Sequence, residues 1–199
     1  MTASLPLTEE RNPLSASIDR ASTEQVLAVI NDEDGRVAAA VREQIPQIAK
    51  ALDAIADRWD RGGRLLYCGA GTSGRLGVLD AAECPPTFGT APGRVLGVIA
   101  GGPDALLQSV EGAEDSRASA RADLQRHGLC ARDALVGIAA SGRTPYVLGA
   151  VAYAAAAGAL TVGLSCNPGS PLERRCDHPI TTAVGPEVVS GSTRMKSGT

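Results

Sequence analysis

Residues 65–83 have the sequence LLYCGAGTSGRLGVLDAAE, which divides into an apolar run, a glycine-rich loop and a helical segment. The run Leu65–Cys68 is continuously apolar rather than alternating, as expected of a strand buried on both faces of a sheet. Three glycines follow it, and a helix is expected over Ser73–Glu83. A strand, a tight loop and a helix in this order predict the start of a βαβ unit.

The same alternation of apolar runs and helical segments continues toward the C-terminus. Further apolar runs predict strands at Val95–Ala100, Ala134–Ala140, Ala159–Ser165 and, more weakly, Ile180–Val184. Helical segments are expected between the runs, over Asp104–Arg126 and Pro145–Ala157. This alternation predicts an α/β fold whose parallel strands are joined by right-handed crossovers.

The chain before the first strand has a different character. It is polar through about Ile30 and is expected to wrap over another part of the molecule or over a partner subunit. Over Val37–Trp59 apolar residues recur at steps of three or four, which predicts a helix with one buried face. Pro46 should kink or split this helix, and Gly62-Gly63 should end it.

These patterns suggest two regions. We place an N-terminal arm and helix at residues 1–45 and the main domain at residues 46–199. The last ten residues are rich in hydroxyl side chains and glycine, a composition that normally introduces another element. The domain is therefore expected to be truncated at its C-terminus.

Composition excludes several classes of function. The 199 residues carry 19 basic and 22 acidic side chains and only 3% aromatics, which disfavours nucleic-acid binding. The apolar stretch Ala150–Leu160 falls short of the roughly 20 residues of a membrane span, and the first twenty residues do not resemble a signal peptide. Five cysteines without CxxC pairs and two distant histidines disfavour disulfides and metal binding. We therefore expect a cytoplasmic protein without a metal ion.

The glycine loop carries the first indication of a ligand. Its spacing fits a dinucleotide fingerprint, but no acidic residue closes the second strand, and Arg75 stands where a nucleoside-triphosphate loop needs lysine. Thr72 and Ser73 instead place hydroxyls beside backbone N–H groups at a helix start, which suits a terminal phosphate. The plainer alternative is a glycine turn that packs the helix on the strand.

A second loop repeats this pattern. The third strand leads into Ser141-Gly142-Arg143-Thr144-Pro145, again with hydroxyls before a helix. Two such loops on neighbouring strands could hold one phosphate from two sides. Ser141 and Thr144 therefore join Thr72 and Ser73 as candidate substrate-binding residues.

Two carboxylates differ in their expected settings. Glu83 is predicted at the end of its helix, just before Cys84-Pro85-Pro86, where the helix dipole favours the neutral form and so suits a general acid. Glu114 is predicted within the next helix, three residues before Arg117. Spacing alone favours a solvated helix face for Glu114.

Taken together, these blocks resemble the N-acetylmuramic acid 6-phosphate etherases, which are lyases built on the sugar isomerase (SIS) domain. The blocks that carry the resemblance are residues 8–13 (TEERNP), 31–34 (NDED), 69–77 (GAGTSGRLG), 79–89 (LDAAECPPTFG), 111–115 (EGAED), 141–146 (SGRTPY) and 191–199 (GSTRMKSGT). The block around Glu-Cys-Pro-Pro-Thr is the most specific of them. The family's chains continue beyond this pattern through a further helical region.

The resemblance implies a three-layer α/β sandwich with a central, mostly parallel five-stranded sheet, preceded by N-terminal helices. It implies a cytoplasmic, cofactor-free homodimer that binds a phosphorylated amino sugar. From composition we expect no nucleic-acid or membrane partner. The implied reaction cleaves the D-lactyl ether of N-acetylmuramic acid 6-phosphate by elimination and water addition, giving N-acetylglucosamine 6-phosphate and D-lactate. The family's proton donor corresponds to Glu83, and its second catalytic carboxylate, the base, corresponds to Glu114.

Two other functions fit the same fold. An aldose–ketose sugar-phosphate isomerase also removes a C2 proton, but it delivers the proton to C1 and has no leaving group at C3. A sugar-phosphate-sensing regulatory protein would bind the ligand without turnover. Lactate release, ketose formation and binding alone distinguish the three.

Overall fold

A five-stranded sheet lies at the centre of the computed structural model, which describes residues 5–198. Residues 1–4 of the predicted arm and Thr199 at the predicted domain end lie outside the described residues. All strands are parallel, in the order β2-β1-β3-β4-β5. The strands are β1 (Leu65–Gly69), β2 (Val95–Ile99), β3 (Ala134–Ile138), β4 (Leu160–Ser165) and β5 (His178–Thr181). The predicted α/β sandwich with a five-stranded parallel sheet is confirmed.

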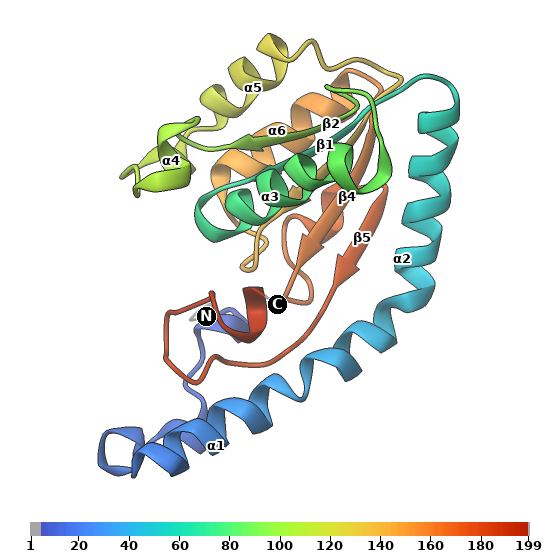
Figure 1. Ribbon diagram of the computed structural model, residues 1–199. Helices are drawn as coiled ribbons and strands as arrows, with labels where there is room; N and C mark the ends of the chain where they lie inside the picture. Colours follow the sequence, from blue (N-terminus) through green and yellow to red (C-terminus); the bar gives the residue numbers. More distant parts are fainter. Residues whose placement is uncertain (1–4, 199) are drawn as a thin grey trace.

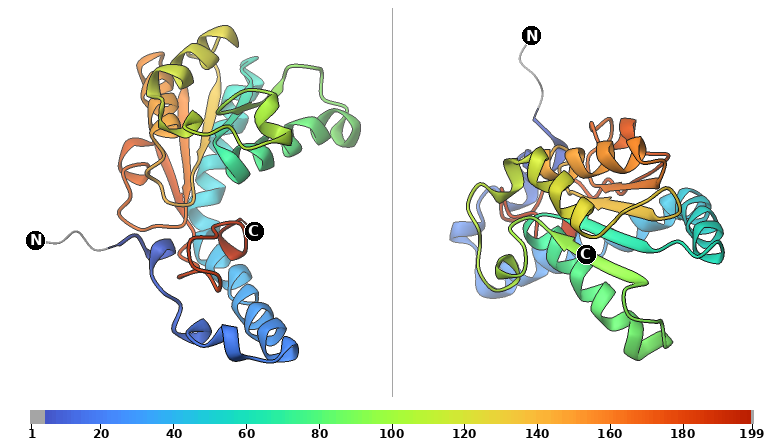
Figure 2. Two further views of the ribbon diagram at one scale, coloured as in Figure 1. Left: turned by 90° about the vertical axis from the view of Figure 1, so that its left-hand side faces the viewer. Right: turned by 90° about the horizontal axis from the view of Figure 1, so that it is seen from above.

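Helices cover both faces of the sheet, which explains why its strands are continuously apolar. Helices α2 (Val37–Asp60) and α3 (Gly71–Phe88) pack on one face, and α5 (Arg117–Arg126) and α6 (Pro145–Ala156) on the other (Figures 1 and 2). In β1, Leu65 and Tyr67 join the apolar cluster under α2. Leu66 and Cys68 join the larger cluster under α5 and α6.

The strand order creates a point at which the chain reverses its direction of travel across the sheet. From β1 the chain passes through α3 to β2 at one edge, whereas from β3 it passes through α6 to β4 and then to β5 at the other edge. The reversal lies between the neighbouring strands β1 and β3. In open parallel sheets, ligands bind outside the carboxyl ends of the strands at this point.

The helix that follows β1 is longer than predicted. It was expected to stop at Glu83, but α3 continues through Pro85 and Pro86 to Phe88 and ends at Gly89, whose φ is +65°. The backbone N–H of Gly89 donates to the Pro85 carbonyl and closes the final turn. Glu83 therefore lies inside the helix, and the prediction that it lies at the helix end is wrong.

The single helix predicted over Asp104–Arg126 is also wrong, because this segment is divided. Helix α4 (Asp104–Leu107) is followed by a loop, a 3-10 turn over Ala113–Asp115 and then α5. Gly112 has a φ of +69°, which breaks the helical path. The Ser116 side chain accepts a hydrogen bond from the Ser119 N–H and starts α5. Glu114 thus lies in a loop turn rather than in the middle of a helix.

The N-terminal region combines turns and two helices. Three 3-10 turns precede α1 (Thr23–Asp34), which starts with a capping box formed by Ser22 and Gln25. The long helix α2 runs unbroken through Pro46, so the predicted split does not occur, and it ends before Gly62 as expected. Among residues 5–198, no helix combines the length and apolar character that crossing a membrane requires.

Candidate active site

Two cavities lie beside the first turn of α3, which begins at the carboxyl end of β1. Gly71 lines one of them, whereas the next two residues, Thr72 and Ser73, line the other. The glycine-rich sequence after β1 therefore separates two differently built spaces. We call them the carboxylate cavity and the hydroxyl cavity.

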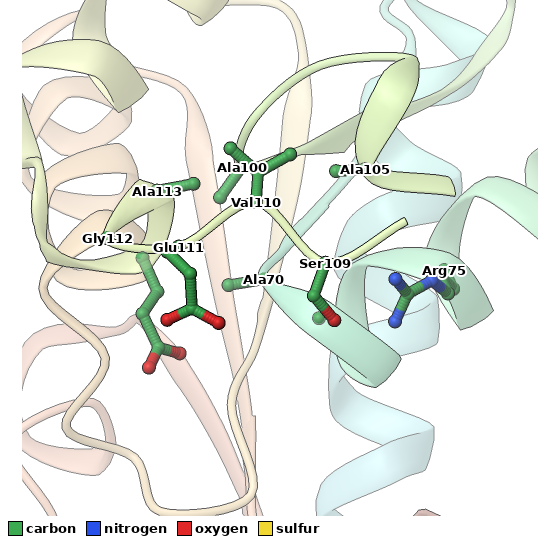
Figure 3. A pocket seen from close by; sticks show the side chains of 11 residues that line it. Ala70, Arg75, Ala100, Ala105, Ser109, Val110, Glu111, Gly112 and Ala113 are labelled. Carbon is green, nitrogen blue, oxygen red and sulfur yellow. The ribbon is translucent and has the colours of Figure 1, made fainter. Parts of the chain in front are cut away.

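The carboxylate cavity has a volume of about 200 Å³ and lies between the exits of β1 and β2. The loop before α5 supplies Ser109, Glu111 and Glu114, all of them solvent-exposed residues. Arg75 of α3 lines the same cavity, and its guanidinium donates to the carbonyls of Leu106 (3.2 Å) and Gln108 (3.5 Å). Figure 3 shows Glu111, Ser109 and the Arg75 guanidinium around its opening. These two hydrogen bonds from Arg75 thus connect α3 to the loop that carries Glu111 and Glu114.

The hydroxyl cavity is larger, about 370 Å³, and lies over the carboxyl ends of β3, β4 and β5. Its polar lining consists mainly of hydroxyl side chains: Thr72, Ser73, Ser165, Thr182, Thr193 and Ser197. Lys196 also lines the cavity, and most of the remaining lining is apolar: Val37, Val41, Ile48, Leu76, Ile138, Leu164, Ile180 and Val184. Hydroxyls and the N–H groups at the start of an 18-residue helix can bind an anion, while the apolar side can contact carbon groups.

Hydrogen bonds among the hydroxyls hold the lining of this cavity in place. The Ser165 hydroxyl lies 3.4 Å from that of Ser170, and Thr182 donates to the Ser165 carbonyl at 3.4 Å. The buried Ser197 hydroxyl oxygen has no hydrogen-bond partner among residues 5–198. A buried hydroxyl without a partner is unusual and indicates a group that a ligand or water could satisfy.

The second predicted phosphate loop has a different setting. Ser141 and Thr144 follow β3, the strand beside β1, as the predicted arrangement requires. The Ser141 hydroxyl, however, accepts a hydrogen bond from the Arg143 N–H at 3.2 Å. Within the described chain, neither Ser141 nor Thr144 lines either of these two cavities. The structure thus brings Thr72 and Ser73 to a cavity but does not bring the other two candidates there.

Among residues 5–198, Glu83 is not one of the residues that line either cavity. It lies on α3 and is exposed. Leu76 and Leu79 precede it by seven and four residues, which places the three on one side of the helix. These leucines are 41% and 58% exposed, and Phe88 at the end of α3 is 76% exposed. Glu83 therefore lies beside an apolar surface that this single chain leaves uncovered.

Several lining residues escaped the sequence analysis. Ser165 and Thr182 lie at or just beyond the ends of the last two strands, a position that could have singled them out. Ser197 belongs to the hydroxyl-rich last ten residues, but nothing in the sequence places it beside the strand ends, which it reaches from beyond the sheet. The sequence block 111–115 contains Glu111, which was not a candidate site residue, but both Glu111 and Glu114 line the carboxylate cavity.

One cysteine, Cys166, also lines the hydroxyl cavity. Burial raises the pKa of its thiol even though the Thr182 hydroxyl and the Ser197 backbone contact the sulfur. The thiol is therefore protonated near neutral pH and is a poor nucleophile. Across residues 5–198, no group of three or more His, Cys, Asp and Glu side chains is arranged to hold a metal ion.

Two family models match the chain. The glucokinase regulatory protein N-terminal SIS domain matches residues 47–155, and the SIS domain matches residues 117–198. Among solved structures, a phosphoheptose isomerase from Neisseria gonorrhoeae superposes with a TM-score of 0.67 at 19% identity, covering 88% of this chain and 91% of that one. The Vibrio vulnificus NanR protein complexed with ManNAc-6P superposes with a TM-score of 0.59 at 14% identity, covering 93% and 61%.

The sequence is much more similar to curated proteins called N-acetylmuramic acid 6-phosphate etherase. The one from Edwardsiella ictaluri is 61% identical over 193 residues, which cover 97% of this chain and 64% of the relative. The one from Streptomyces avermitilis is 58% identical over 192 residues, which cover 96% and 62%. The chain thus spans somewhat less than two thirds of the length of these relatives. It belongs to the SIS domain family and, over nearly all of its length, is similar to the N-acetylmuramic acid 6-phosphate etherases.

Proposed function

We propose that the chain is part of a lyase that converts N-acetylmuramic acid 6-phosphate and water into N-acetylglucosamine 6-phosphate and D-lactate. The observation that carries this proposal is the 58–61% identity to etherases over 96–97% of the chain. The hydroxyl cavity at the start of α3 supports a phosphorylated ligand. The carboxylate cavity beside it supports proton transfer.

Phosphate recognition is assigned to Thr72 and Ser73, with Ser141 and Thr144 as the second loop. Thr72 and Ser73 combine a helix N-terminus with hydroxyl donors on one side of a cavity. A phosphate held there gains both the partial positive charge of the helix end and direct hydrogen bonds. Ser141 and Thr144 would reach the same phosphate only after the Ser141 hydroxyl gives up its bond with the Arg143 N–H.

The proposed reaction proceeds by elimination and addition. Opening of the sugar ring exposes an aldehyde at C1, which makes the hydrogen on C2 acidic. Glu114 removes that proton, the C3–oxygen bond breaks, and Glu83 gives a proton to the departing lactate oxygen. Water then adds to C3 of the unsaturated aldehyde, and C2 regains a proton. General acid and general base catalysis each contribute typically about 10²–10⁴-fold.

A homodimer in the cytoplasm completes the proposal. Glu83 and the carboxylate cavity are separate within one chain, so a shared site requires a second subunit to bring them together. The exposed apolar side chains beside Glu83 support such an interface, because α2 adds exposed Val41, Ile45 and Leu52 to those of α3. Removing these side chains from water would stabilise the dimer.

Incubation with N-acetylmuramic acid 6-phosphate, followed by enzymatic detection of D-lactate, tests the activity. In water enriched in ¹⁸O, the label should appear on the C3 hydroxyl of the sugar and not in lactate. Label in lactate would overturn the elimination scheme. Ketose formation without lactate would instead indicate an isomerase, and tight binding without turnover by a dimeric, full-length protein would indicate a sensor.

A further inference from the structure

We propose that the buried Glu33–Lys196 ion pair, assisted by Asn12, positions the C-terminal wall of the hydroxyl cavity and thereby sets the affinity for the phosphosugar. This wall comprises Thr193, Lys196, Ser197 and Gly198. The inference rests on the proposed function, because the ligand is taken to be a sugar phosphate. Glu33, Lys196 and Asn12 act in it as positioning residues.

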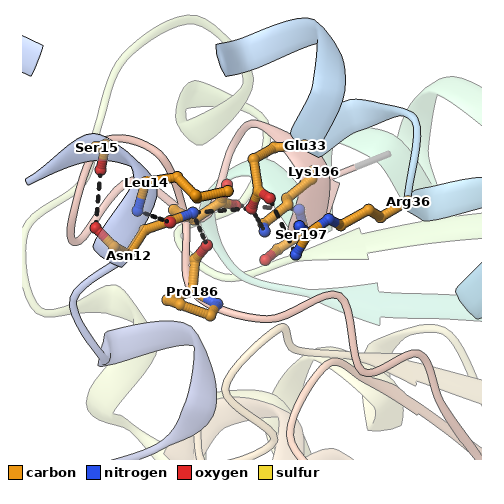
Figure 4. Close-up of polar contacts among 9 residues, drawn as sticks. Asn12, Leu14, Ser15, Glu33, Arg36, Pro186, Lys196 and Ser197 are labelled. Atoms are coloured by element: carbon orange, nitrogen blue, oxygen red, sulfur yellow. Dashed lines mark hydrogen bonds and ion pairs between the residues drawn. The ribbon is translucent and has the colours of Figure 1, made fainter.

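The polar cluster joins three segments that are far apart in the sequence (Figure 4). The Lys196 ammonium and the Asn12 side-chain amide both donate to one carboxylate oxygen of Glu33, the amide at 2.8 Å. The same amide donates to the Pro186 carbonyl at 3.0 Å. The Arg36 guanidinium lies 3.1 Å from the other Glu33 oxygen. The arm, the end of α1 and the C-terminal segment thus meet at one carboxylate.

Burial makes this cluster unusual. Glu33 is 1% exposed, Lys196 is 2% exposed and Asn12 is 4% exposed. Removing two opposite charges from water is costly, and apolar side chains of similar volume often stabilise a protein as well or better. General stability is therefore a weak explanation for an ion pair at this position. The directional hydrogen bonds of the pair do explain why Lys196 is held in one fixed position.

That placement determines the shape of the hydroxyl cavity. Glu33 lies at the end of α1, four residues before Val37, which starts α2 and lines the same cavity as the C-terminal segment. The pair therefore connects two walls of one space. The adjacent Ser197 N–H donates to the fully buried Glu187 carboxylate at 3.0 Å, which gives the segment a second attachment.

The contacts also define what Lys196 does. Its ammonium is occupied by Glu33 and lies against Gly185, where an added Cβ would be 3.6 Å from the nitrogen. Thr193 and the unpartnered Ser197 hydroxyl remain as the groups of this wall that can contact a ligand. Loss of the pair should release these hydroxyls from their positions. Glu114, the proposed base, lines the other cavity, and Glu83, the proposed acid, lines neither, so proton transfer should be affected much less.

A double variant, Glu33→Gln with Lys196→Met, removes both charges without leaving either one buried alone. Affinity for N-acetylglucosamine 6-phosphate, measured by titration calorimetry, should fall about tenfold, the equivalent of about 1.4 kcal/mol. The KM for the etherase substrate should rise in parallel, while kcat changes less than about threefold. Backbone amides of residues 188–198 should exchange with deuterium faster than in the unmodified protein.

Arg64 and Asp133 provide a matched control. They form a partly buried ion pair, at 2.7 Å, directly before the amino ends of β1 and β3, at the end of the sheet away from the hydroxyl cavity. Arg64→Met with Asp133→Asn should lower stability without changing phosphosugar affinity. Equal loss of affinity in both double variants would overturn the proposal, as would unchanged affinity in Glu33→Gln/Lys196→Met.

A milder variant keeps the test decisive if the double variant does not fold. Asn12→Ala removes one donor to Glu33 and should weaken binding by about two- to fivefold, as expected for one hydrogen bond. Unchanged affinity and unchanged exchange of residues 188–198 in this variant would contradict the positioning role. If the unmodified protein binds no phosphosugar at all, the proposed function fails, whereas altered exchange in the variants would still support the structural connection.

Discussion

The two cavities beside α3 differ in what builds them. The hydroxyl cavity is formed largely by strand ends and by the first turn of a long helix, which are anchored by the sheet. The carboxylate cavity is formed largely by the loop before α5, whose attachment to α3 includes the two carbonyls that accept from Arg75. A rigid frame suits the recognition of an unreactive phosphate, whereas the loop carries Glu114, the group assigned to removal of the C2 proton. Substitutions in the two cavities should therefore affect different steps.

The largest effect is expected from Glu114→Gln in the carboxylate cavity. Loss of the base should lower D-lactate release by about 10²–10⁴-fold and should equally suppress exchange of the C2 hydrogen with deuterated water. Proton NMR of the sugar measures the exchange, and a lactate assay measures the release. Affinity for N-acetylglucosamine 6-phosphate should stay nearly unchanged. Exchange that survives in this variant would remove Glu114 from the role of base.

Glu83→Gln should lower D-lactate release by a similar factor but should leave exchange of the C2 hydrogen intact. Because the base remains, the C2 hydrogen should still exchange while D-lactate release falls about 10²–10⁴-fold. The same two measurements distinguish the variants. If exchange vanishes in Glu83→Gln and survives in Glu114→Gln, the two assignments must be reversed. Sedimentation of both variants checks that the oligomeric state is unchanged.

Ser73→Ala should produce a smaller effect confined to the hydroxyl cavity. A hydrogen bond to a charged group contributes about 1.5–3 kcal/mol, so affinity for the phosphorylated sugar should fall about tenfold or more. Affinity for the unphosphorylated sugar should not change. Ser109→Ala is the matched control, because this serine lines the carboxylate cavity and should leave phosphosugar affinity unaltered. Equal losses for both sugars in Ser73→Ala would contradict a role in phosphate binding.

Acidification should have the smallest effect. It should lower stability through Glu33, which positions the C-terminal wall of the hydroxyl cavity. Burial by itself would raise the pKa of Glu33, but hydrogen bonds from Lys196 and Asn12 and the charges of Lys196 and Arg36 lower it below its usual value. The stability that this carboxylate provides is therefore complete above the unfolded pKa of about 4.3 and is lost as pH falls through the lower folded value.

Thermal unfolding between pH 7 and pH 3 measures this contribution. The unmodified protein should lose about 2–4 °C of Tm for each kcal/mol removed on acidification. Glu33→Gln/Lys196→Met should show a shallower decline, because its amide does not titrate. Identical slopes for the two proteins would show that Glu33 does not contribute to acid sensitivity. Asp133, whose pKa is also lowered by Arg64 against the effect of burial, should account for part of the remaining decline.

The sequence by itself determined the elements that depend on local pattern. Continuous apolar runs identified the first four strands, whereas the fifth, predicted at Ile180–Val184, spans His178–Thr181. The loop after Cys68 identified Thr72 and Ser73 before their cavity was visible. These signals are local, because the burial of a strand and the start of a helix depend on residues a few positions apart. The prolines after Glu83 led to a predicted helix end that is too early, because α3 accommodates both prolines in its final turns and ends at Gly89.

The tertiary structure decided everything that depends on residues distant in the chain. Glu33 meets Lys196 across 163 positions, and Thr8 meets Asn167 across 159 positions. The loop carrying Glu114 forms a cavity with α3 only because β1 and β2 pair and place their exits side by side. The spacing of apolar residues along the sequence does not predict such long-range contacts. They follow from the order of strands in the sheet, which brings distant segments to one edge and makes their side chains neighbours.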